Sequence, residues 1–398
     1  MIFCGLFTEL GAHFLLESAR LVTSMYPSVN SDALSFADIA SHATPRLAFL
    51  PTVLVIVTCL GSAVSALVVA GDILPATLQD LALLFHHTSW VEDSDGKVDS
   101  YLLNRPTWVT LPLVCVLPLC FLHSITSLQY VGIVTCVTVV YFIVLVFVLF
   151  LFPSAGACLL YPTSSSRTCA ENVVAYPASV SSLVHSFLLA CPIFFVSFSI
   201  IYQVLPVHNA LRYPSLTTTR RATAGALVFS GLTYLLVSVS AYLTFGDRVQ
   251  GNLFKNYGNT GALAVSRVMM LAVVALLFPL VIFAARASLL SLFPSASLFT
   301  PHHFVSATVV LVVVSYLLAL SCNDLSVILG TVGALATVPV SLTLPSLYFL
   351  RLSSLSPTLS SLPAEEEGKT RRWRVVARIG VGLGLVMTVL FMYGTYAT

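Results

Sequence analysis

The chain has 398 residues, of which 58% are hydrophobic and only 9% are charged, and its net charge is +2. Because a soluble domain carries about 25% charged residues, this composition excludes a soluble globular protein. The small net charge, together with the lack of a basic block alternating with aromatic residues, also excludes a nucleic-acid partner.

Apolar runs separated by turn and charge signals predict ten helices. The runs are long enough to cross a hydrocarbon core about 30 Å thick, so we expect an all-α, multi-pass integral membrane protein in a lipid bilayer. The predicted spans lie near residues 2–22, 51–70, 108–125, 131–152, 180–206, 222–245, 261–285, 303–321, 325–350 and 375–396.

Basic residues are divided unequally between the two sets of loops that alternate along the chain. The set 23–50, 126–130, 207–221, 286–302 and 351–374 contains ten Lys and Arg residues, and the other set contains five. The positive-inside rule therefore predicts that the first set is cytoplasmic. An even number of spans then places both chain ends outside, and we expect one further helix upstream of Met1.

The stretch 351–374 is rich in Ser and Pro and ends in a basic cluster. Such a composition is typical of a flexible segment. We therefore predict a membrane-embedded helical core at 1–350, a cytoplasmic linker at 351–374 and a final transmembrane helix at 375–398.

The first span carries ionisable residues along one helix face. Glu9, His13 and Glu17 are spaced by four residues, and Arg20 follows three later. Glu17 and Arg20 lie near the predicted cytoplasmic end, where they can reach water, whereas Glu9 and His13 lie deeper. A carboxylate one turn from an imidazole is a candidate proton relay, and the alternative is a packing pair.

Cysteine and histidine spacings predict no metal site, and no nucleotide-binding loop or catalytic set of an enzyme is visible. We therefore expect no cofactor and no enzyme activity. Cys158 and Cys169 flank a polar loop between two spans. They would be able to form a disulfide if that loop faces an oxidising compartment.

The span 180–206 has the most unusual pattern, because a proline near its middle precedes serines that alternate with phenylalanines. These residues are Pro192, Phe194, Phe195, Ser197, Phe198 and Ser199. Proline removes a backbone hydrogen bond, and the freed carbonyls are tolerated in a membrane where they line a cavity. Pro279 in span 261–285, and Gly330, Gly333, Pro339 and Pro345 in span 325–350, suggest similar breaks.

Three broken spans in one bundle favour a binding pathway, since the ends of half-helices bind ions and zwitterions. The alternative for each break is a kink that only serves packing. We expect the break in span 180–206 to centre on residues 192–199, with Gln203, His208 and Asn209 at the cytoplasmic end of the same helix.

The order of these motifs resembles the amino acid/auxin permease family, which includes sodium-coupled neutral amino acid transporters. The phenylalanine-rich stretch followed by Val204, Leu205 and Pro206 is similar to the sixth helix of that family. The segment AYLTFGDRVQGNLF (241–254) is similar to the end of the seventh helix and FPLVIFAAR (278–286) to the eighth. GTVGALATVPVSLTLPSLYFL (330–350) and ALVVAGDILP (66–75) are similar to the tenth and third.

The resemblance implies the fold of the bacterial leucine transporter, with two inverted five-helix repeats and an eleventh helix. The ten visible spans would match helices two to eleven, so the first helix of the family would be missing. In that fold the substrate binds beside the sixth helix. The implied substrate-binding residues are the six named in span 180–206, with Ser62, Ser65, Met270 and Val274 across from them.

Sodium-coupled members of the family carry threonines just before the proline of the eighth helix, where this chain has Ala275 and Leu277. Neither side chain can ligate a hard cation. The resemblance therefore implies an amino acid permease that works by alternating access and is proton-coupled or sodium-independent. Neutral amino acids suit it better as substrates than cationic ones. The alternative is a truncated, non-transporting membrane scaffold or sensor. The sequence does not distinguish a plasma membrane from a vacuolar or lysosomal one.

Overall fold

The computed structural model describes residues 1–27, 34–84, 105–121, 131–152, 180–211, 215–246, 249–257, 261–292, 301–322, 324–356 and 364–396. Within these ranges the chain is helical and contains no strand. The first helices are α1 (Ile2–Met25), α2 (Phe36–Ala43), α3 (Leu50–Leu84), α4 (Arg105–Cys120), α5 (Val131–Leu151), α6 (Val180–Ser197) and α7 (Ile201–Ala210). They are followed by α8 (Leu216–Phe245), α9 (Gly261–Ser291), α10 (Pro301–Ser321), α11 (Leu325–Val332), α12 (Leu344–Leu355) and α13 (Ala364–Tyr396).

Within the described ranges, eight helical segments are long and apolar enough to cross a bilayer. They are Ile2–Met25, Pro45–Leu78, Val131–Leu151, Leu216–Phe245, Gly261–Ser291, His302–Ser321, Leu325–Leu355 and Thr370–Thr395, and Pro106–Cys120 and Ser186–Ser197 are shorter apolar helices. Eight of the ten predicted spans overlap one of the long segments, and spans 108–125 and 180–206 overlap the two shorter helices. The chain is thus an all-α, multi-span membrane protein. The inverted repeat and the missing first helix stay predictions.

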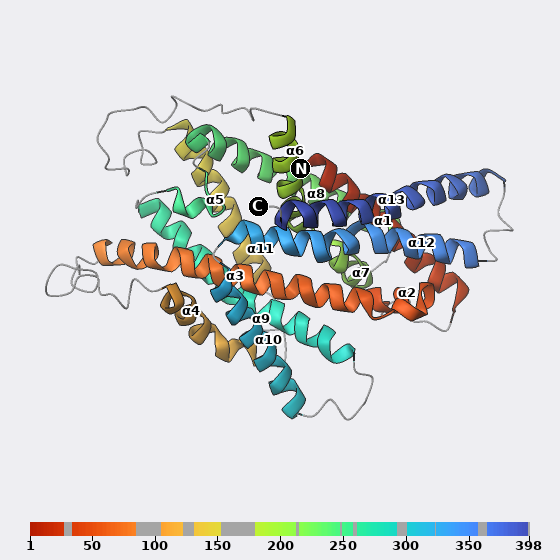
Figure 1. Ribbon diagram of the computed structural model, residues 1–398, viewed down its shortest axis with the longest axis horizontal. Coiled ribbons are helices and arrows are strands. Elements are labelled where there is room, and N and C mark those ends of the chain that lie inside the picture. The colour runs from red at the N-terminus through yellow and green to blue at the C-terminus, as the bar shows by residue number, and fades with distance from the viewer. Residues whose placement is uncertain are drawn as a thin grey trace.

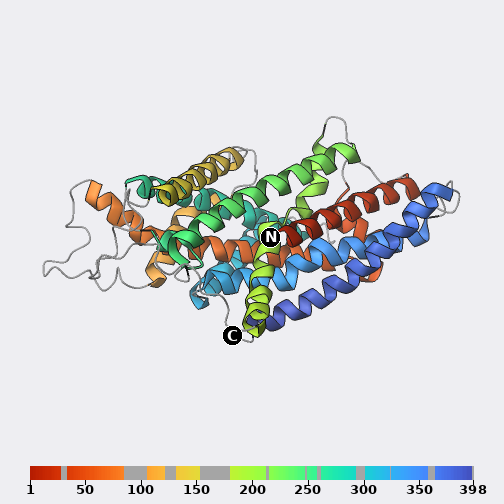
Figure 2. The same ribbon diagram turned by 90° about the horizontal axis from the view of Figure 1, so that it is seen from above.

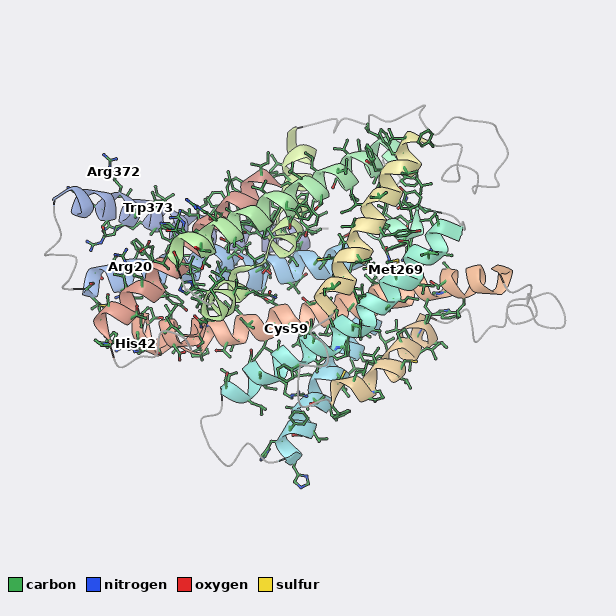
Figure 3. The ribbon with its side chains drawn as sticks, turned by 180° about the vertical axis from the view of Figure 1, so that it is seen from behind. Arg20, His42, Cys59, Met269, Arg372 and Trp373 are labelled. Carbon is green, nitrogen blue, oxygen red and sulfur yellow. The ribbon has the colours of Figure 1, made fainter. Side chains whose placement is uncertain are left out.

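The helices α1, α3, α12 and α13 run along the long axis of the bundle, whereas α6 crosses it (Figures 1 and 2). The C-terminal end of α1 lies at one end of the bundle, beside α2 and the start of α13. Arg20, His42 and Arg372 gather there in Figure 3, and we call it the basic end. The N-terminus and the C-terminal end of α13 lie away from the basic end in both ribbon views.

Two large apolar clusters hold the bundle together. One joins α1, α2, α7 and α12, and includes Leu16, Ile201 and Tyr348. The other joins α3, α4, α9 and α10, and includes Leu67 and Phe278. The outward faces of α5, α8, α10 and α13 expose large apolar side chains. Such faces are suited to contact with lipid tails.

The predicted linker is helical at both ends. The helix α12 continues to Leu355, and α13 begins at Ala364, so only 357–363 lies outside the described residues. Alanine, glutamate, lysine and arginine dominate the second half of this stretch and are good helix formers. The side chain of Arg374 also bonds Ser353 of α12, with Nε donating to Oγ at 3.2 Å. The last helix therefore begins 11 residues, or about three helical turns, before the predicted residue 375.

Candidate substrate site at a helix break

The helix in span 180–206 is interrupted at residues 198–200, between α6 and α7, and we call this interruption the break. The Phe198 N–H still bonds the Phe194 carbonyl at 3.0 Å, but the Ile200 N–H turns back to the Phe198 carbonyl at 2.9 Å. Pro192 lies inside α6, which continues through it. The break was expected at 192–199, and it lies at the end of that range, six residues beyond the proline.

Contacts with α1 and α8 hold the break in place. The Tyr234 hydroxyl donates to the Ser197 carbonyl at 3.0 Å, which satisfies one backbone group freed by the end of α6. The Phe198 ring packs edge-on against Tyr234, with centroids 5.4 Å apart. It also lies 3.8 to 3.9 Å from the positions where Gly5 and Gly231 would carry a Cβ. Two glycines thus make room for this ring between α1 and α8.

The two serines near the break differ in orientation. Ser197 is exposed, and its hydroxyl donates to the Ile193 carbonyl of its own helix at 3.0 Å. The Ser199 hydroxyl oxygen is buried and has no hydrogen-bond partner among the residues that the structure describes. A buried hydroxyl without a partner costs about 1–3 kcal/mol. Ser199 is therefore the serine that can bind a polar ligand inside the bundle.

The helix that follows α11 widens beside the break. Residues Gly333–Thr337 and Pro339–Thr343 form π-helical turns, and together we call them the π segment. The Ser341 carbonyl touches α1 at Gly11, and Ile201, the first residue of α7, also lies 3.7 Å from a Cβ at that glycine. The Ser341 hydroxyl is a second buried polar atom without a partner in the described part of the chain. π-Helical turns occur frequently at functional sites.

The helices of the other two spans in which breaks were expected, 261–285 and 325–350, are not interrupted within their described residues. The helix α9 runs continuously through Pro279, and residues 325–355 form one continuous helix that changes from α to π and back. Wider turns relieve the clash that a proline ring would cause in a regular α-helix, so residues 325–355 stay helical through their prolines. Within the described residues of these three spans, only span 180–206 is broken.

The predicted substrate-binding residues fall into two groups. Phe195 and Phe198 belong to an apolar cluster with α1, α8 and α13, and Phe194 packs at its edge. Met270 and Val274 of α9 belong instead to the cluster around α3. Ser62 and Ser65 are partly buried on α3, and each hydroxyl donates to the carbonyl four residues earlier in its own helix.

The start of the π segment separates these two groups. The Pro192 carbonyl packs directly on Gly333, and Gly61 of α3 packs on Val332. One turn of helix therefore lies between α6 and α3. The structure brings the residues of span 180–206 together, but it does not bring Ser62, Ser65, Met270 and Val274 to the break.

The two candidate relay residues contact different helices. Glu9 lies beside Thr223 and Arg220 of α8, and its buried Oε2 has no hydrogen-bond partner within the described ranges. The His13 ring packs against Trp373 of α13, with centroids 4.5 Å apart. Proton exchange between the two stays a prediction. The possible disulfide between Cys158 and Cys169 lies outside the described residues.

A sequence profile of the family described as "Transmembrane amino acid transporter protein" matches residues 1–397. The chain belongs to this family. The family consists of transporters, so this amino acid transporter family protein is not an enzyme, and the family implies amino acids as substrates.

Relatives of this transporter family protein come from yeasts and from human. "Vacuolar amino acid transporter 5" of Saccharomyces cerevisiae is 25% identical over 394 residues, which cover 88% of this chain and 81% of that protein. The protein of the same name from Schizosaccharomyces pombe is 24% identical over 398 residues, covering 98% and 84%. "Sodium-coupled neutral amino acid transporter 4" of Homo sapiens is 27% identical over 217 residues, covering 52% and 36%.

In this transporter family protein, the eighth-helix motif ends in a buried arginine that joins three helices. Arg286 of α9 is 2% exposed. Its Nη1 donates to the Cys120 carbonyl at the end of α4, at 3.0 Å, and to the Thr308 hydroxyl of α10, at 2.8 Å. The guanidinium also lies 3.8 Å from the centroid of the Phe304 ring. The motif therefore anchors α9 and does not line the break.

The sequence gives no direct signal for several residues of the site. Tyr234 and the glycines that surround Phe198 are distant in sequence from the break, and only the tertiary structure brings them to it. In the sequence, glycines and prolines mark the π segment, and they indicate a break or a packing kink but give no signal for π-helical turns. Ser341 lies between Pro339 and Pro345, and this position could have directed attention to it.

Proposed function

We propose that this protein is a secondary permease for neutral amino acids that works by alternating access, without sodium and with proton coupling. The observation that carries the proposal is the break between α6 and α7, which leaves the Ser199 hydroxyl buried and without a described partner. Membership of the amino acid transporter family supports it, and gives a non-transporting scaffold or sensor no better support.

The chemistry around the break suits a zwitterion with an uncharged side chain. The C-terminal end of α6 carries partial negative charge and the N-terminal end of α7 partial positive charge, so the two ends complement an ammonium and a carboxylate. The nearby side chains of Phe195, Phe198, Ser199 and Ser341 are apolar or hydroxylated. They offer no fixed charge for a cationic or anionic substrate.

The coupling ion is inferred from two places in the chain. Ala275, at the position of the sodium-ligating threonine of related proteins, packs against the apolar cluster around α3 and α9. A hard cation requires oxygen ligands, so this environment favours sodium-independent transport. Glu9 of α1 is the proposed proton carrier, because ionisable residues within a span are usually functional and its Oε2 is buried.

We also propose that the basic end faces the cytoplasm, as the excess of Lys and Arg in the corresponding loops predicts. The yeast relatives are named as vacuolar transporters, which supports an acidic internal compartment on the other side. Export from such a compartment would then run with the proton gradient.

Uptake of radiolabelled L-alanine into proteoliposomes tests the proposal. Imposed pH and sodium gradients should be compared, and a pH gradient should drive uptake whereas a sodium gradient should not. Glu9→Gln should lose the stimulation by the pH gradient but keep alanine exchange at equal pH. Uptake driven by sodium alone, or unaltered pH dependence in Glu9→Gln, would contradict the proposed coupling.

A matched pair of serine variants tests the site. Ser199→Val should reduce uptake at least tenfold, because it removes the buried hydroxyl at the break. Ser197→Val should stay within about twofold of the unmodified protein, since that hydroxyl is exposed and bonded to its own helix. Equal effects of the two substitutions would show that the break does not contact the substrate.

A further inference from the structure

A small cavity lies at the basic end, between α1, α7 and α8, away from the break. Its volume is about 160 Å³, which is close to the roughly 150 Å³ of a protein cavity that holds benzene. A small amino acid fits such a space. Arg20, which lies on its rim, is labelled in Figure 3.

The cavity has an apolar floor and a polar rim. Ala19, Leu34 and Leu205 line it and are each less than 8% exposed. Arg20, Thr23, His208 and Asn209 also line it and are more accessible. A fully hydrated anion such as phosphate would gain nothing from the apolar floor. An amphiphilic molecule with a short apolar side chain fits both parts.

Arg20 supplies the positive charge on the rim. Its Nη1 lies 3.6 Å from Glu17 Oε2, and the two side chains are 66% and 28% exposed. An exposed ion pair of this kind contributes about 0–1 kcal/mol, so Arg20 can exchange Glu17 for a ligand carboxylate at little cost. The N-terminal end of α8 adds partial positive charge, and its N-cap Ser215 makes no side-chain capping bond. Leu216, the next residue, lines the cavity.

His208 supplies an acceptor. The hydroxyl of the buried Thr219 donates to the Ser215 carbonyl at 3.1 Å, so its oxygen is available to accept from His208 Nδ1, which lies 2.7 Å away. This places the proton on Nδ1 and leaves the Nε2 lone pair free to accept. Burial lowers the pKa of His208, which favours the neutral ring.

Asn209 supplies a second acceptor. Its Nδ2 donates to the Leu34 carbonyl at 3.2 Å, so the amide oxygen remains for a donor. Both residues lie at the C-terminal end of α7, where the helix dipole favours positive charge. The rim thus has one cationic side, which suits a carboxylate, and one side of hydrogen-bond acceptors, which suits an ammonium.

We propose that this cavity is a second amino acid site, in which Arg20 binds the carboxylate and His208 and Asn209 bind the ammonium. The inference rests on the proposed function, because it takes an amino acid as the ligand. The site is separate from the break, so an occupant at the basic end would bind at the same time as one beside Ser199.

Equilibrium binding of tritiated L-alanine to the full chain in lipid nanodiscs tests this inference. The unmodified protein should bind two alanines. Arg20→Gln should weaken binding to one of the two at least tenfold, and Leu216→Trp, which fills the cavity from its rim, should remove the same one. Arg221→Gln is the matched control, because Arg221 is an exposed arginine of α8 that does not line the cavity.

Competitors identify the ligand chemistry. Propionate and ethylamine each carry one half of the alanine recognition groups, and each should displace alanine from this site at least tenfold less well than unlabelled alanine does. Inorganic phosphate should not displace it. Displacement by phosphate as effective as by alanine would overturn the amino acid assignment, and so would unaltered binding in both Arg20→Gln and Leu216→Trp.

The two proposals fail separately. If Ser199→Val keeps full uptake while Arg20→Gln still loses one bound alanine, the break site is wrong and the second site stands. If uptake depends on Ser199 while Arg20→Gln binds two alanines, the break site stands and the second site is wrong. Because Arg20 is exposed, its substitution should leave the elution profile and melting temperature of the protein unaltered.

Discussion

Replacement of Gly333 by alanine tests the contact that fixes α6 just before the break. A Cβ at this position would overlap the Pro192 carbonyl oxygen and lie 2.6 Å from its carbonyl carbon, closer than the 3.0 Å that real Cβ contacts respect. The clashing atoms belong to the backbone and cannot rotate away. The π segment must therefore retreat from α6 by at least about 0.4 Å measured to that carbon, and further to clear the oxygen.

Overpacking of this kind costs about 1–3 kcal/mol, and we expect the upper half of that range because two backbones are involved. The better helix propensity of alanine offsets about 1 kcal/mol of this cost. The net loss in the free energy of unfolding should therefore be about 1–2 kcal/mol. Thermal unfolding in detergent should show a lower melting temperature, and alanine uptake should fall as the break moves.

Gly225→Ala is the matched control, because a Cβ at Gly225 meets nothing within 4 Å. This variant should unfold at the same or a slightly higher temperature than the unmodified protein. A melting temperature of Gly333→Ala equal to that of Gly225→Ala would refute the close contact between α6 and the π segment.

Three further substitutions have expected outcomes. Tyr234→Phe should cost about 1–2 kcal/mol of stability, since it leaves the Ser197 carbonyl without its 3.0 Å donor, whereas Tyr242→Phe, at an exposed position of the same helix, should be neutral in thermal unfolding. Arg286→Gln should cost about 2–4 kcal/mol, because a buried charged donor to two helices is lost, and an unaltered melting temperature would contradict this role. Burial lowers the pKa of His208, so the stability that it contributes is complete above the ordinary histidine pKa of about 6.5 and is lost as the pH falls through the lowered value. His208→Gln should reduce the change in melting temperature between pH 8 and pH 5. An equally steep pH dependence in this variant would show that another group is responsible.

The helices and the family could be predicted because their signals are local. A run of about 20 apolar residues specifies a membrane span by its own length, and the motif in span 180–206 marked the helix that is interrupted. The exact position of the break could not be predicted in this way. The helix tolerates Pro192 and ends where Phe198 inserts between Gly5 and Gly231, a contact between residues that are far apart in the sequence.

The division of the predicted site into two groups has a similar cause. Ser62 and Met270 were placed opposite the break by resemblance, and their residue types suit a binding site. Their distance from α6 depends on Val332 and Gly333, which pack between the two groups. The linker was assigned from its Ser and Pro content, and the contact of Trp373 with His13, which helps to hold the first turns of α13, has no signature in the linker itself.

The π segment alters the rotational phase of the helix that follows it. A π-helical turn spans one residue more than an α-helical turn, and each extra residue rotates the remaining helix by about 100° relative to a regular α-helix. Two such turns come before α12, so Tyr348 and its neighbours point about 200° away from where an unbroken α-helical pattern would direct them. A one-residue deletion in 333–343 would therefore turn the face that now packs on α1 and α2 toward other surroundings, although the apolar length of the span would hardly change.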